Sequence, residues 1–83
     1  MEFEYTDTVY ILEEDIEKMV KLASEVLSQY SIVTFRTKIE VIQTAISTVA
    51  AKYDDAYFYE IGKIEDQLIF EICNRIKKEE NKK

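Results

Sequence analysis

One stretch, residues 32–53, changes its hydrophobic periodicity and so constrains the fold more than any other part of the chain. Its first residues alternate, with Val33 and Phe35 on one face, in a segment rich in β-branched and aromatic side chains. From Lys38 onward, apolar residues recur every three or four positions and form one buried stripe: Ile39, Ile42, Ala45, Ile46, Val49 and Tyr53. The sequence therefore predicts a strand over 32–37 that runs into a helix lying on a sheet.

The preceding segment predicts another strand followed by a helix. Residues Thr8 to Leu12 alternate as a first strand, and three acids at 13–15 then open a helical pattern that extends to about Gln29. Negative charge is favourable beside the unpaired N–H groups of a first helical turn. The buried stripe of this helix is predicted to contain Ile16, Met19, Val20, Ala23, Val26, Leu27 and Tyr30.

The following segment is compatible with two structures. Asp54-Asp55 ends the second helical pattern, 56–61 alternates as a third strand, and Gly62 to Asp66 fits a short turn. Residues 67–73 then return as a fourth strand with Leu68, Phe70 and Ile72 on one face. A helix is the alternative, because Ile64, Leu68, Ile69, Ile72, Cys73 and Ile76 also fall on one helical face. Only Phe70 is badly placed on that helix, so residues 64–78 stay open between strand and helix.

Size and composition indicate one globular domain. A chain of 83 residues buries only about 60–65% of its unfolded surface, which favours a dimer. The apolar share is 47% and the charged share 34%, and no apolar run approaches the roughly 20 residues that span a bilayer. The N-terminal residues are acidic, unlike a signal peptide. We expect a cytoplasmic protein without a membrane segment. The lack of proline, the single glycine and the abundance of Glu, Lys and Ile fit a thermophile.

Residue types that support catalysis are scarce. Cys73 is the only cysteine and the chain has no histidine, so the commonest general base and metal ligand is absent. Acid pairs such as Asp54/Asp55 and Glu65/Asp66 are typical of solvated turns and helix ends, and a phosphate-binding loop needs more than one glycine. The sequence predicts a non-catalytic protein with no cofactor and no metal site.

Charge is unevenly distributed along the chain. The net charge is −6, and residues 1–35 carry eight acids and two bases, whereas the remaining residues carry nine of each. A nucleic-acid-binding domain usually presents a basic face. The composition of the whole chain does not indicate one.

Local sequence and the order of elements together resemble a known family. The segment Ile42-Gln-Thr-Ala-Ile-Ser-Thr-Val49 matches the family pattern of a second helix, and Leu27-Ser-Gln29 resembles the end of its first. Residues 68–78, with their basic end, resemble the closing strand. Over about residues 8–78 the chain resembles the Alba family, small archaeal chromatin proteins that dimerise and bind DNA and RNA.

This resemblance implies an α/β fold, with two helices packed on a four-stranded mixed sheet in βαβαββ order. It implies a single domain over 1–78 and a charged tail over 79–83. The implied partner is nucleic acid, bound through its phosphate backbone by a homodimer or by a heterodimer with a basic homologue. The implied contact residues are Arg36, Lys38, Lys63, Arg75, Lys77 and Lys78.

Departures from the family pattern support a second hypothesis. Acids occupy 13–15, where the family has a lysine pair that touches DNA, and Glu40 stands where a base is common. Ile39 replaces a glycine, and the Arg-rich hairpin arm shrinks to Gly62–Asp66. Like charge facing phosphate lowers affinity. The alternative is therefore an acidic Alba-like interaction protein that pairs with a basic homologue or another partner and does not bind DNA itself.

Overall fold

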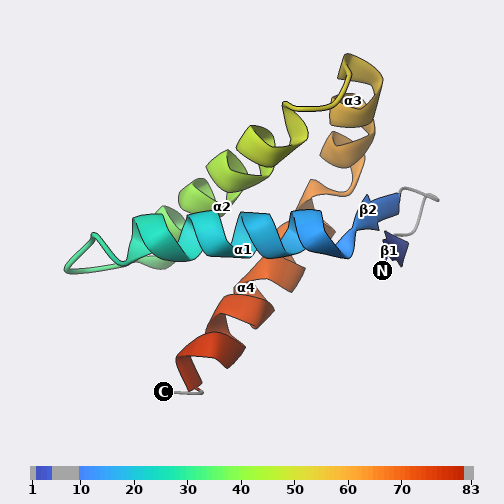
Figure 1. The fold of residues 1–83 in the computed structure, drawn as a ribbon. Coiled ribbons are helices and arrows are strands. Elements are labelled where there is room, and N and C mark those ends of the chain that lie inside the picture. Colours follow the sequence, from blue (N-terminus) through green and yellow to red (C-terminus); the bar gives the residue numbers. More distant parts are fainter. Residues whose placement is uncertain (1, 5–9, 82–83) are drawn as a thin grey trace.

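The computed structural model describes residues 2–4 and 10–81, most of which are helical (Figure 1). The chain begins with a short antiparallel hairpin in which Phe3 lies opposite Ile11. Its strands are β1 (Glu2–Glu4) and β2 (Tyr10–Leu12). The helices that follow are α1 (Glu13–Leu27), α2 (Phe35–Ala50), α3 (Asp55–Lys63) and α4 (Glu65–Asn81).

Three long helices pack against one another around a single core. Helix α1 contacts both α2 and α4, which also contact each other, while α3 packs on α2. In Figure 1, α1 runs across the front, α2 rises from behind its left end, and α4 crosses behind it toward the lower left. The hairpin lies at the start of α1, and the loop that joins α1 to α2 lies at the opposite end.

The core is almost entirely aliphatic, and its residues follow the helical period. Every side chain in it is less than a tenth exposed: Ile11, Ile16, Met19, Val20, Ala23, Ile42, Ala45, Ile46, Val49, Ala50, Ile61, Ile64, Leu68, Ile69, Ile72 and Ile76. Each fully buried Ile, Leu or Met contributes about 1.5–3 kcal/mol relative to an exposed position. The stripes expected for α1 and α2 supply most of the first half of this core, but Val26 and Tyr30, expected to be buried, are exposed.

A buried carboxylate connects the first turn of α1 to the end of α2. Asp15 is fully buried; it accepts hydrogen bonds from Lys52 Nζ at 2.6 Å and from the Tyr53 hydroxyl at 2.5 Å. Burial by itself would raise the pKa of Asp15, but these two hydrogen bonds outweigh it and hold the pKa below its usual value. The carboxylate in turn raises the pKa of the Lys52 ammonium.

A second ionic contact connects the same turn to α4. Arg75 donates from both terminal nitrogens to the Glu13 carboxylate, at 3.0 Å for Nη2, and from Nε to Glu71 at 2.7 Å. The hydrogen bonds from Arg75 hold the pKa of Glu13 below its usual range. The acids at 13–15 therefore do more than complement the helix dipole, because two of them join α1 to its neighbours.

The expected βαβαββ fold is wrong. Residues 56–61 and 67–73, expected as the third and fourth strands, are helical in α3 and α4. Residues 32–34 form a loop and Phe35 begins α2, so the strand expected over 32–37 is wrong as well. The four-stranded sheet that the Alba resemblance implies is absent from residues 2–4 and 10–81.

Helix caps explain two of these corrections. The Thr34 hydroxyl accepts a hydrogen bond from the Thr37 N–H at 3.1 Å and so starts α2 three residues before Lys38. The Asp54 carboxylate accepts from the Tyr57 N–H at 2.9 Å and starts α3 in the same way. A side chain that satisfies an N–H of the first turn favours a helix over the extended backbone that alternation suggests.

The helical alternative for residues 64–78 is confirmed. Phe70, the residue that fits this helix badly as a core position, points outward and is 62% exposed. Gly62, expected in a hairpin turn, lies inside α3, and the chain turns at Ile64 instead. Of the strand expected over 8–12, the structure describes Tyr10–Leu12 as β2, and the first two residues lie outside the described residues.

Candidate functional site

The six basic residues expected to contact nucleic acid come from three different helices. Two lie in the first turns of α2, one ends α3, and the rest lie in the second half of α4. They are, in that order, Arg36, Lys38, Lys63, Arg75, Lys77 and Lys78. No strand–helix turn or hairpin brings them together, because the sheet that would align them does not form.

Three of these bases are already paired with acids. Arg36 Nε donates to Glu40 at 3.3 Å, and Lys63 Nζ donates to Glu60 at 3.1 Å, both on the surface. Arg75 is held between helices by its two carboxylate partners and is mostly buried. The Arg75 guanidinium joins α1 to α4 through its ion pair with Glu13, and binding a phosphate instead would break that ion pair.

The most unusual surface feature is apolar and lies at the α1–α2 loop. Helix α1 ends at Leu27, and the segment that follows exposes large hydrophobic side chains before α2 begins. Ile32 is 79% exposed and Phe35 is 77% exposed. Val33 and Tyr30 are close to half exposed, at 43% and 49%. The Thr34 cap fixes Phe35 as the first residue of α2, where its ring stands clear of the core.

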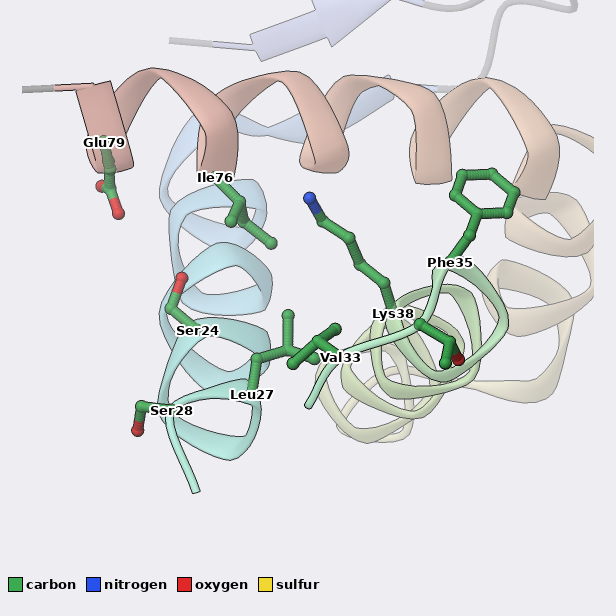
Figure 2. A pocket seen from close by; sticks show the side chains of 9 residues that line it. Ser24, Leu27, Ser28, Val33, Phe35, Lys38, Ile76 and Glu79 are labelled. Carbon is green, nitrogen blue, oxygen red and sulfur yellow. The ribbon is translucent and has the colours of Figure 1, made fainter. Parts of the chain in front are cut away.

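Of these residues, Val33 and Phe35 line a groove of about 510 Å³ between the end of α1, the start of α2 and the second half of α4. We call it the loop-end groove. It is lined by Ser24, Leu27, Ser28, Val33, Thr34, Phe35, Lys38, Ile76 and Glu79. Figure 2 shows Leu27 and Val33 meeting on one side and Ile76 pointing in from α4, so two sides of the groove are apolar.

Lys38 is the polar group at the centre of the groove. Its side chain is half-buried and reaches from α2 toward α4, ending between Ile76 and Phe35 in Figure 2. None of the described side chains forms an ion pair or hydrogen bond with its ammonium. Glu79, the only acid that lines the groove, lies at its far end in Figure 2. The groove thus combines apolar walls with one cation that the described residues leave without a counter-ion.

Sequence reasoning identified parts of this site but assigned them differently. Lys38 was expected to meet phosphate, Val33 and Phe35 to lie in a sheet, and Leu27 to be core. Ile76 was placed on a helical face only in the alternative reading. The groove is not visible in the sequence because it unites residues around 27, 35 and 76, which only the packing of α4 brings together.

Two further properties of the described residues bear on function. Along residues 2–4 and 10–81, no group of three or more acids or cysteines is arranged to hold a metal ion. None of the helices in the same part is long and apolar enough to cross a membrane. Compared with known proteins, the chain matches no family model, no curated protein and no solved structure.

Proposed function

We propose that this protein is a non-catalytic binding protein that holds an apolar segment of another protein in the loop-end groove. The observation that carries the proposal is the exposure of Phe35 in the lining of an apolar groove and of Ile32 in the adjoining loop. Exposed apolar patches of this kind, rimmed by polar residues, mark interaction surfaces. Covering both side chains with a partner would contribute about 1.5–3 kcal/mol for each.

This proposal keeps the second hypothesis from the sequence, an interaction protein, without the Alba-like sheet. Nucleic-acid binding, the first hypothesis, stays a prediction of the resemblance. Lys38, Lys77 and Lys78 support it, and the ion pairs of the other three bases weigh against it. Ile32 and Val33 are aliphatic and neither stack on bases nor bind phosphate, whereas the exposed ring of Phe35 is compatible with either function.

Selection from a displayed library of random peptides tests the proposal. The wild-type protein should enrich peptides with several apolar residues, and the double variant Ile32→Ser/Phe35→Ser should fail to enrich them. Phe70→Ser is the matched control, because Phe70 is also well exposed but lies outside the groove. Enrichment of the same peptides by the double variant would show that they bind elsewhere and would remove the proposal.

Titration with labelled duplex DNA and structured RNA at low salt tests the other hypothesis. The proposal predicts flat anisotropy curves. Saturable binding that weakens with salt and with Lys77→Ala/Lys78→Ala, but is unchanged by Ile32→Ser/Phe35→Ser, would favour a nucleic-acid-binding protein instead.

A further inference from the structure

Charge is segregated along this chain in a way that the net value conceals. Residues 1–17 and 53–66 contain twelve acids and one base, whereas the remaining residues contain five acids and ten bases. All three walls of the loop-end groove belong to the second group: the end of α1, the start of α2 and the second half of α4. The acidic protein therefore carries its groove on segments that are net positive.

Among the described residues, the acidic hairpin and α3 lie away from the loop end, although Lys52 and Arg75 pair with acids of the first group. In Figure 1 the hairpin, the start of α1 and α3 lie on one side, and the α1–α2 loop lies on the other. An acidic partner would be repelled by the first side and attracted by the second. The net charge of −6 repels a negatively charged partner at long range, but the local distribution of charge directs such a partner to the loop end.

Lys38 gives the same preference at short range. Its half-buried side chain reaches across the groove toward Ile76, and no described side chain forms an ion pair with its ammonium. A carboxylate brought by a partner would supply the missing counter-ion through a charge-assisted hydrogen bond. Glu79 lies away from Lys38 at the end of the groove, where it would oppose a second acid.

We propose that the occupant of the loop-end groove is an acidic amphipathic peptide segment of a partner protein, with apolar side chains against Leu27, Val33 and Phe35 and a carboxylate on Lys38. This inference rests on the binding function proposed above and adds the chemistry of the partner. The acid of the segment faces Lys38, and a neutral or basic residue faces Glu79. The groove therefore selects peptides by their acidic and apolar residues and by the direction in which the peptide chain runs.

Peptide selection on charge variants tests this inference. From one displayed library of amphipathic peptides, the wild-type protein should enrich Asp and Glu next to apolar residues. Lys38→Glu should lose that preference and enrich Lys or Arg at the same position, while Glu79→Lys keeps the acid preference. For one selected peptide, replacing its acid by the amide should weaken binding to wild type about tenfold and leave binding to Lys38→Gln unchanged.

Each outcome separates the partner chemistry from the binding function. Enriched peptides without excess acid, or the same peptides on wild type and Lys38→Glu, would overturn the inference and leave the binding function standing if Ile32→Ser/Phe35→Ser still abolishes selection. Peptides that bind irrespective of Ile32 and Phe35, or Lys38-dependent binding of labelled duplex DNA in place of peptides, would overturn both. Circular dichroism confirms the helical fold of each variant, and Lys38→Gln replaces Lys38→Glu if the reversed charge prevents folding.

Discussion

Asp15 carries the one fully buried charge among the described residues. Hydrogen bonds from the ammonium of Lys52 and the hydroxyl of Tyr53 compensate its lost hydration, and the Lys18 ammonium lies 4.0 Å away. The two partners differ in their own surroundings, because the Lys52 side chain is 41% exposed. The cost of breaking this contact therefore depends on which member is removed.

Substitutions in this pair should be unequal in effect. Asp15→Asn should lower the free energy of unfolding by about 1–2 kcal/mol, since the released Lys52 ammonium turns to water. Lys52→Met should be more damaging, because it leaves a buried carboxylate without its counter-ion. Urea unfolding followed by circular dichroism measures both. Lys63→Met is the control for a surface pair and should stay within about 0.5 kcal/mol of wild type. A larger loss for Asp15→Asn than for Lys52→Met would contradict the assigned roles.

Acid should destabilise the protein through Glu13 and Asp15. Both have a pKa below the ordinary value in the folded state, so the folded state binds fewer protons than the unfolded one. Their contribution is fully present above the unfolded pKa values and is lost as pH falls through the folded ones. The urea midpoint should thus begin to fall below about pH 5. The double variant Glu13→Gln/Asp15→Asn should lose much of that dependence, and an unchanged pH profile would refute the assignment.

At the scale of elements, helices with an unbroken period were predictable and those with aromatic residues on the surface were not. Helices α1 and α2 were predicted from the apolar residues that recur every three or four positions along them. The segment 56–61 alternates in sequence, yet Phe58 and Tyr59 are exposed on a helix, so its pattern reflects surface aromatics rather than the two faces of a strand. The exposed Phe70 likewise suggested a strand over 67–73, where the structure has a helix. An outward aromatic on an isolated helix cannot be told from an inward one on a strand by periodicity alone.

Part of the candidate site could also be predicted from the sequence and part could not. Lys38 and Phe35 could be singled out from their residue types, but their setting depends on a cap and on a distant helix. The two N-caps could be recognised in the sequence, because Thr34 and Asp54 are residue types that the N-cap position favours. The contribution of Ile76 could not, since local sequence carries no information on where α4 crosses the end of α1.

Removing the cap of α2 tests how the loop-end groove is held. Thr34→Val, which keeps the shape but loses the hydroxyl, should lower the free energy of unfolding by about 1 kcal/mol, whereas Thr34→Ser should be close to neutral. Thermal denaturation by circular dichroism gives both values. Equal stability of the two variants would mean that the hydroxyl does not cap the helix.

At the scale of the whole molecule, the homodimer expected from the chain length stays a prediction, and a second groove offers a surface for it. This groove of about 380 Å³ lies between α1 and α2 and is lined in part by Leu22, Val26, Tyr30 and Val41. Sedimentation velocity over a range of concentrations should show a dimer that Val26→Glu dissociates and Phe70→Glu does not. A monomer at every concentration would remove the prediction.

The brief connections between the helices determine how fast the molecule can assemble. Residues 28–34, 51–54 and 64 are all that separates one helix from the next, so α1 meets α2, and α2 meets α3, over a small stretch of chain before α4 returns to α1 and α2. The chain contains no proline, so no slow peptide-bond isomerisation delays it. Refolding from urea should be a single exponential completed within about milliseconds, the regime of helical proteins with local topology. Stopped-flow fluorescence of the tyrosines measures this rate, and a concentration-independent phase lasting seconds would contradict it.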